Sequence, residues 1–104
     1  MQMYNYHFEV ERKARRIFIA DNIGYGNIVA TVRYRGKTSS RARINTLSDT
    51  GIITVYTEQW QVVTVHIANY EQACIIYRKA HGSEPPEYLK DKFRTAQQWK
   101  EFEP

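Results

Sequence analysis

The segment from Arg41 to Ala68 constrains the fold most, because it consists of three β-rich runs separated by short turn signals. The runs are Arg41 to Ser48, Ile52 to Thr57 and Gln61 to Ala68, with Ser-Asp-Thr-Gly and Glu58-Gln59 between them. Runs rich in β-branched residues and bounded by turn-forming residues are typical of strands joined by tight turns. The segment therefore predicts a three-stranded antiparallel meander.

The residues from His7 to Ala20 have the pattern of an amphipathic helix. Val10, Ala14 and Ile17 recur at helical spacing and form its apolar side. The polar side then displays Arg12, Lys13, Arg15 and Arg16. The aromatic and β-branched residues at positions 18 and 19 leave the end of this segment open to a strand.

The next segment allows two interpretations. Asp21 or Asn22 is a suitable cap for a second short helix, which Gly36 would terminate. However, Gly24, Gly26 and the β-branched residues that follow are equally compatible with a loop and a strand over residues 28–34, because they lower helix propensity. We expect the helix and keep the strand as the alternative.

Two helices are expected after the meander. Asn69 and Gln72 have the spacing of a capping box, which predicts a helix that continues to residue 80. Pro85 and Pro86 suit the first turn of a last helix. Its apolar residues are Leu89, Phe93, Ala96 and Trp99. The predicted fold is thus a single α+β domain over residues 1–104, with two N-terminal helices, a three-stranded antiparallel sheet and two C-terminal helices.

The composition limits the compartment and the number of domains. A chain of 104 residues suffices for one hydrophobic core. No run of about 18 apolar residues and no signal-peptide pattern occurs, so we expect a cytoplasmic protein without a membrane partner. Cys74 is the single cysteine and lies in an apolar run, which predicts a buried thiol rather than a disulfide.

The positive charge is concentrated in the N-terminal part of the chain. Residues 1–43 contain nine Lys or Arg and three acids, whereas residues 44–104 contain six and eight. Basic surfaces most often bind phosphate backbones, although a solvated face is an equally good explanation. The partner expected here is nucleic acid or a nucleoprotein complex. The candidate binding residues are Arg12, Lys13, Arg15, Arg16, Arg33, Arg35, Lys37, Arg41 and Arg43, with Tyr25 and Tyr34 as aromatic contacts. A homodimer is a further candidate, because a three-stranded sheet leaves two edges unpaired.

A ribonuclease site is the alternative to simple binding. Alternation along the strands suggests that Arg41 and Arg43, Tyr56, and His66 share one polar face of the sheet, if the register aligns them. His66 would act as base or acid, His7 as the second such group, an arginine as the stabiliser of phosphorane charge, and Tyr56 as an auxiliary donor. The histidines and the cysteine show no metal-ligand spacing, and no glycine loop for phosphate occurs, so no metal and no cofactor are expected.

Two stretches support a family resemblance. The run Asp49-Thr50-Gly51-Ile52-Ile53, followed by Val62-Val63-Thr64-Val65-His66-Ile67-Ala68, resembles small uncharacterised prophage proteins of Firmicutes over about residues 45–80. The meander also resembles that of RelE-like and barnase-like ribonuclease toxins. The resemblance implies a phage protein that inhibits a host defence nuclease or modifies host nucleoprotein machinery, with an endoribonuclease toxin as the alternative. Whether the chain is an enzyme stays open.

Overall fold

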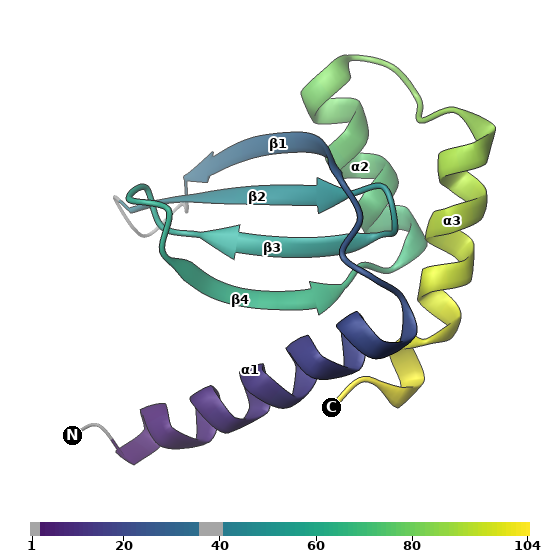
Figure 1. Ribbon diagram of the computed structural model, residues 1–104. Coiled ribbons are helices and arrows are strands. Elements are labelled where there is room, and N and C mark those ends of the chain that lie inside the picture. Colours follow the sequence, from purple (N-terminus) through teal and green to yellow (C-terminus); the bar gives the residue numbers. More distant parts are fainter. Residues whose placement is uncertain (1–2, 36–40) are drawn as a thin grey trace.

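The computed structural model describes residues 3–35 and 41–104, with side chains at position 10 and, within these ranges, from position 12 onward. It has an α+β fold in which four antiparallel strands form one sheet in the order β1-β2-β3-β4 (Figure 1). The elements in chain order are α1 (Met3–Asn22), β1 (Ile28–Arg35), β2 (Ala42–Ser48), β3 (Ile52–Tyr56), β4 (Val62–Ile67), α2 (Tyr70–His81), α3 (Glu87–Gln98) and the 3-10 helix η1 (Lys100–Phe102). Within these described residues no helix is long and apolar enough to cross a membrane.

The prediction of two N-terminal helices and a three-stranded sheet is wrong. The segment expected to form the second helix is β1, which pairs along its length with β2 and makes the sheet four-stranded. Gly24 and Gly26 adopt positive φ angles of 87° and 65°, and the helix therefore does not continue through them. The β-branched residues that follow favour the extended backbone. The alternative interpretation of residues 28–34, a strand, is the correct one.

Helix α1 packs on the sheet with a different side from the one that the sequence predicts. Val10 and Ile17 are each 51% exposed, whereas Ile19 is fully buried. The contact with the sheet is made by Phe18 and Ile19 in the C-terminal half of the helix, together with Ile23 directly after it. The stripe that begins at Val10 therefore faces away from the sheet.

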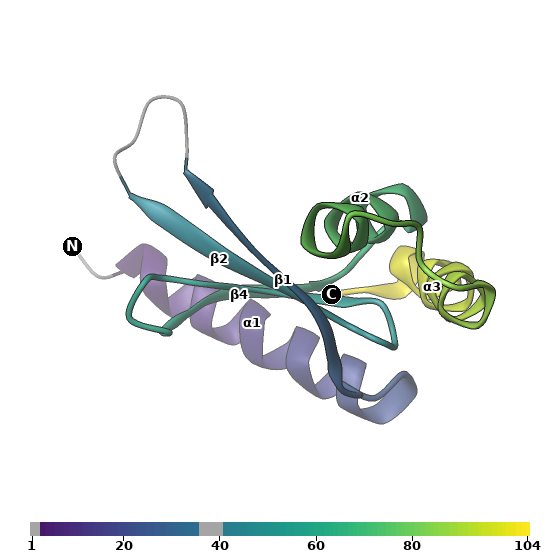
Figure 2. The same ribbon diagram turned by 90° about the horizontal axis from the view of Figure 1, so that it is seen from above.

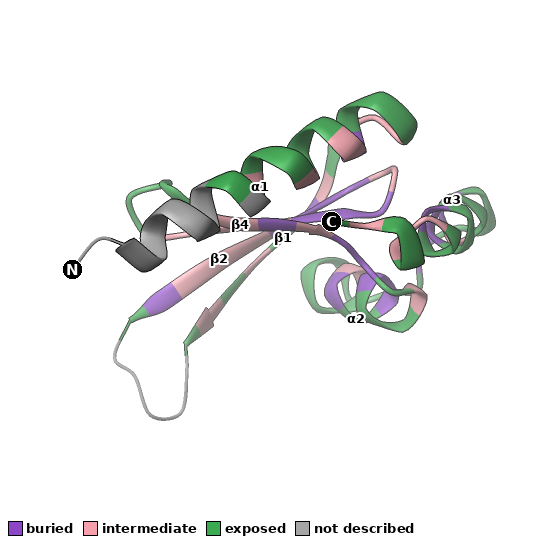
Figure 3. Cartoon of the chain, turned by 90° about the horizontal axis from the view of Figure 1, so that it is seen from below, coloured by how far each residue is buried: buried purple, intermediate pink, exposed green. Residues whose placement is uncertain are grey.

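The two faces of the sheet bury separate apolar clusters (Figures 2 and 3). On one face, α2 and α3 cover a cluster that includes Leu47, Ile53 and Phe93. On the other face, α1 covers Ile52 and its neighbours on β4. Cys74 is 3% exposed within the first cluster, so the predicted buried thiol is confirmed. Because both faces need apolar residues, neither face of β3 and β4 is simply polar.

The turn between β2 and β3 fixes the end of the sheet against α3. The backbone N–H of Ile52 donates to Ser48 Oγ at 3.0 Å, which closes the turn. Gly51 has a φ angle of 86°, and a Cβ atom at this position would lie 2.9 Å from the Cβ of Ala96. Only glycine combines this backbone conformation with so close an approach of the helix.

The two C-terminal helices lie where the sequence places them. The Asn69 side chain accepts a hydrogen bond from the backbone N–H of Gln72 at 2.8 Å, as the capping-box spacing predicts. Gly82 ends α2 in the left-handed conformation. Helix α3 begins directly after Pro86. Its buried residues are Leu89, Phe93 and Ala96.

Side chains close the outer edge of β4. The backbone N–H of Ile67 donates to Glu103 Oε2 at 2.7 Å, and its carbonyl oxygen accepts from Lys100 Nζ at 2.6 Å. Arg15 Nη1 donates to the carbonyl oxygen of Val65 at 3.1 Å. These contacts satisfy backbone groups that an edge strand otherwise offers to a further strand.

Candidate nucleic-acid interface

Half of one sheet face has no helix over it. Helix α1 lies along β4 on the side of the sheet opposite α2, and it does not extend across β1 and β2 (Figures 1 and 2). The side chains of Thr31, Arg33 and Arg35 are accordingly exposed. We call this uncovered part of β1, β2 and β3, together with the β3–β4 turn, the open face.

The register aligns a cation and an aromatic ring across the open face. Arg33 on β1 lies opposite Ile44 on β2, and Ile44 lies opposite Tyr56 on β3. Directly paired residues of antiparallel strands project from the same face of the sheet. The next row consists of Thr31, Thr46 and Thr54. Thr46 is buried at 3% exposure, whereas Arg33 is exposed and Tyr56 is partly exposed. Arginine and a phenol ring are thus presented on one face of the sheet from two strands.

Trp60 extends this surface from the β3–β4 turn. Its ring packs on that of Tyr56 with centroids 5.2 Å apart and planes tilted by 60°. Trp60 remains 57% exposed. Its φ angle is 64°, a backbone conformation that residues other than glycine adopt at an energetic cost. The turn therefore holds a large aromatic ring in solvent beside Tyr56.

The cation of the open face has an acidic partner in the same turn. Arg33 Nη2 forms an ion pair and hydrogen bond with Glu58 Oε2. The side chains are 59% and 40% exposed, so the pair contributes little to folding stability. It holds the guanidinium on the side of the sheet that carries Tyr56 and Trp60. A phosphate that approached this guanidinium would compete with the Glu58 carboxylate.

A hollow of about 200 Å³ lies beside the aromatic pair on the same face. Its lining residues are Tyr25, Gly26, Ile28, Thr46, Ser48, Ile52, Thr54 and Tyr56. The Tyr25 hydroxyl donates to the carbonyl oxygen of Arg16 at 3.3 Å, which links the loop after α1 to the helix. Burial raises the pKa of the Tyr25 phenol, and the positive charge of Arg16 partly offsets this rise. The phenol is therefore neutral at physiological pH and acts as a donor.

The predicted binding residues of the strands are divided between the two faces. Arg33 and Arg35 belong to the open face, and Tyr25 lines its hollow. Arg43 and Tyr34 lie opposite each other on the α2 side, where Lys79 Nζ lies 5.7 Å from the centroid of the Tyr34 ring. Arg41 is exposed immediately before β2, and Lys37 lies outside the described residues.

The basic residues of α1 differ in their exposure. Lys13 and Arg16 are exposed, whereas Arg12 and Arg15 are partly buried. Arg15 also donates through Nε to the carbonyl oxygen of Pro104 at 3.1 Å, in addition to its contact with β4. The Arg15 guanidinium is therefore engaged in contacts within the fold.

The residues of the hypothetical ribonuclease site are not brought together on one face. His66 lies opposite Ile53, and Arg43 shares that side of the sheet, which α2 partly covers. Tyr56 projects from the open face on the other side. The side chain of His7 lies outside the described part of the structure. The expected shared polar face therefore does not include Tyr56.

The environment of His66 favours a neutral imidazole. Burial lowers the pKa of His66 below its ordinary value, and the positive charges of Lys100 and Arg15 lower it further. Glu103 and a hydrogen bond with the Gln72 side chain oppose this decrease. His66 thus interacts with charged or polar residues of α1, α2 and the C-terminal segment.

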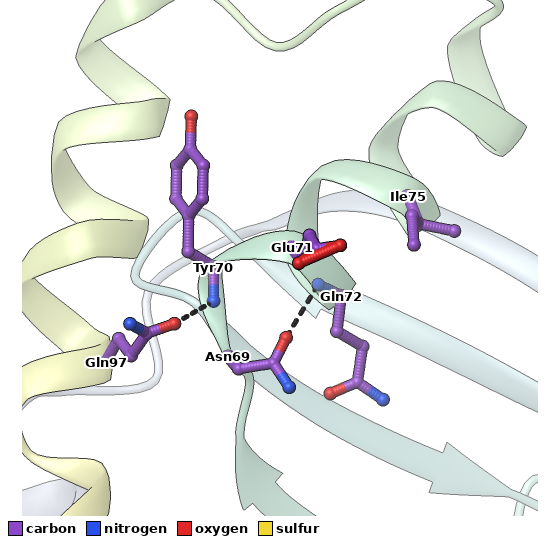
Figure 4. A pocket seen from close by; sticks show the side chains of 6 residues that line it. All are labelled: Asn69, Tyr70, Glu71, Gln72, Ile75 and Gln97. Atoms are coloured by element: carbon purple, nitrogen blue, oxygen red, sulfur yellow. Dashed lines mark hydrogen bonds between the residues drawn. The ribbon is translucent and has the colours of Figure 1, made fainter.

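A larger and more open hollow lies at the start of α2 (Figure 4). Two of the backbone N–H groups that begin this helix donate to side chains, Gln72 to Asn69 Oδ1 and Tyr70 to Gln97 Oε1. The Glu71 carboxylate adds negative charge to the same turn. The side-chain oxygens and the Glu71 carboxylate make this turn a poor site for an anion such as phosphate, so the open face is the better candidate.

Among the residues that the structure describes, no group of three or more His, Cys, Asp or Glu side chains is arranged to hold a metal ion. Sequence reasoning did not identify Trp60 and Glu58 as part of a site. The signal for Trp60 was a large aromatic residue next to a predicted turn, where exposure is expected. Which residues lie beside Trp60 on the open face depends on the strand register, which the sequence does not give.

Comparisons with protein-family models, with curated proteins and with solved structures found no match. The resemblance to prophage proteins and to ribonuclease toxins therefore stays a prediction from the sequence. The geometry of the open face is the remaining indication of function.

Proposed function

We propose that the protein binds nucleic acid through the open face. The observation that carries this proposal is the row from Arg33 to Tyr56 with Trp60 beside it, on the part of the sheet that no helix covers. Guanidinium groups bind phosphate oxygens, and exposed aromatic rings stack on bases. The net charge of +4 favours the approach of a polyanion.

Loss of a single positive charge tests this proposal. Arg33→Gln removes one phosphate contact, so we expect weaker binding and a slope of log affinity against log salt that is smaller by about 1. Arg94→Gln is the matched control, because Arg94 is an exposed arginine in an ion pair with Asp91 on α3. Fluorescence anisotropy with a labelled oligonucleotide measures both variants. Equal losses in the two variants, or binding that does not respond to salt, would contradict the proposal.

The alternative function, a RelE-like endoribonuclease, makes a different prediction for the same experiment. Incubation with labelled total RNA would then yield cleavage products that His66→Ala abolishes. Nucleic-acid binding predicts a mobility shift of intact RNA that His66→Ala leaves in place. If neither cleavage nor a shift occurs, the partner to seek is the protein part of a host nucleoprotein complex, such as a defence nuclease.

For a homodimer, the other partner expected from the sequence, the described residues make the β1 edge of the sheet more accessible than the β4 edge. Glu103, Lys100 and Arg15 occupy the outer edge of β4. At the other edge, His81 Nε2 is hydrogen-bonded to the carbonyl oxygen of Val29 at 2.6 Å, near the start of β1. We propose the rest of β1 as the place where a second copy would add its strand. Sedimentation at several concentrations tests this, and a monomer at every concentration would exclude it.

A further inference from the structure

We infer that the preferred ligand of the open face is a single strand of nucleic acid, with one base stacked on Trp60 and a neighbouring base in the hollow beside Tyr56. This inference rests on the proposed function and makes it more specific. A binder of duplex phosphates needs cations alone, because the faces of the bases are stacked inside the double helix. A surface that combines a cation with exposed aromatic rings matches a strand whose bases are free.

The conformation of Trp60 supports this assignment. A tryptophan in the left-handed region, 57% exposed, contributes little to the core. The tight β3–β4 turn, closed by the hydrogen bond from Thr57 N–H to the carbonyl oxygen of Gln61, requires this conformation and fixes the backbone from which the indole projects. Tyr56 supports one side of the indole ring, since their centroids are 5.2 Å apart. The solvent-accessible part of the indole is then available to a base.

The hollow can recognise a base by its shape, not by a pattern of hydrogen-bond donors. Its volume of about 200 Å³ is below the range of roughly 300 to 1,000 Å³ that is usual for pockets of drug-sized ligands, so it suits one planar ring. The Thr46 hydroxyl donates to the carbonyl oxygen of Thr54 at 3.4 Å, and Ser48 Oγ is hydrogen-bonded to Thr50 Oγ1 at 2.9 Å. Because these hydroxyl groups already have partners, we expect weak discrimination among the bases.

Arg33 is placed to hold the backbone between the two base sites. It lies in the same cross-strand row as Tyr56, and Tyr56 both contacts Trp60 and lines the hollow. A strand that places one base on each side of Tyr56 therefore brings the intervening phosphate toward this row. The ion pair with Glu58 is exposed and can exchange for a phosphate contact.

The experiment compares a labelled 12-nucleotide strand of mixed sequence with the same strand in its duplex, as DNA and as RNA, by fluorescence anisotropy at low salt. We expect the single strand to bind at least tenfold more tightly than its duplex, as DNA, as RNA or as both. Equal or tighter binding of both duplexes would overturn this inference and leave the proposed function intact. The absence of binding to every oligonucleotide would overturn the proposed function as well.

A second measurement tests the role of Trp60 directly. Trp60→Gly suits the positive φ angle at this position, so the fold should be retained, and circular dichroism checks this. We expect about a tenfold loss of affinity for the single strand, within the range for one stacked base, and little change for duplex. The matched control is Tyr88→Ala, because Tyr88 is a 63% exposed aromatic residue on α3. Equal effects of the two variants would overturn the inference.

Tryptophan fluorescence gives an independent test of stacking. In a Trp99→Phe background, Trp60 is the sole tryptophan and the unlabelled single strand should quench its emission on stacking. Phe18 packs edge-on against residue 99 with centroids 6.0 Å apart, and phenylalanine preserves an aromatic contact there. Emission that stays constant while anisotropy reports saturation would overturn the placement of a base on Trp60.

Discussion

Glu58 is the single residue whose removal should strengthen nucleic-acid binding. Its carboxylate pairs with Arg33 and repels phosphate on the open face. We expect Glu58→Gln to raise affinity about 2- to 5-fold at low salt, the range that corresponds to an exposed ion pair, and the gain to shrink as salt is added. Anisotropy titrations measure the change. Glu87→Gln is the control: it removes an exposed carboxylate near Lys90 on α3, away from the open face, and should have no effect. Unchanged or weaker binding of Glu58→Gln would argue against a phosphate at Arg33.

His66 should make folding stability depend on pH below neutrality. Burial, with Lys100 and Arg15 as further contributors, places its folded-state pKa below the unfolded value of about 6.5. The unfolded chain therefore binds the proton more readily, and the free energy of unfolding falls as pH drops from about 6.5 toward the folded-state pKa. Melting temperatures between pH 8 and pH 5 measure this slope. In His66→Gln the slope should be smaller, and an identical profile would contradict the lowered pKa.

At the scale of elements, α1 shows that the apolar stripe of an amphipathic helix does not by itself identify the side that packs on the sheet. Ile19 is fully buried and Ile17 is 51% exposed, although both are isoleucines of one helix. We expect Ile19→Ala to lower the free energy of unfolding by about 2 to 5 kcal/mol, since it leaves a cavity. Ile17→Ala should cost about 0.5 kcal/mol or less. Urea denaturation measures both, and similar losses would contradict the orientation of α1.

The strands of the meander were predictable because their signals are local. The runs from Arg41 to Ala68 form β2, β3 and β4 with ends that differ by a residue from the expected ones. The strand at residues 28–35 was not predictable in the same way. Asn22 and Gly36 are as common at helix ends as in loops, and the segment is a strand because it pairs with β2. The orientation of α1 likewise depends on which residues the sheet presents to it.

At the scale of the whole molecule, the C-terminal segment stabilises the sheet through its edge. The Glu103 side chain is 12% exposed and accepts the N–H of Ile67 at 2.7 Å. Glu103→Ala leaves this donor without its partner, so we expect a loss of about 1 to 3 kcal/mol in the free energy of unfolding. Thermal or urea denaturation measures it. Glu101→Ala, at an exposed position of η1, is the control. Equal stability of the two variants would show that β4 does not need this contact.

The residue types of the proposed site could be selected from the sequence, but their arrangement could not. The excess of positive charge in residues 1–43 pointed to nucleic acid, and Arg33 and Tyr56 were among the candidate residues. Their alignment depends on two strand pairings, and a shift of one residue would move Tyr56 to the other side of the sheet. The same register places His66 and Tyr56 on opposite faces of the sheet.

The most direct test of the open face is a titration of the ¹⁵N-labelled protein with a single-stranded oligonucleotide, followed by NMR. The two indole N–H signals serve as internal reporters, since Trp60 lies on the open face and Trp99 packs against Phe18. The signals of the Trp60 indole and of the β1 and β3 amides should shift, while those of the Trp99 indole and of α3 should stay in place. Shifts confined to α2, to α3 or to the outer side of α1, with the Trp60 signal unchanged at saturation, would contradict this account.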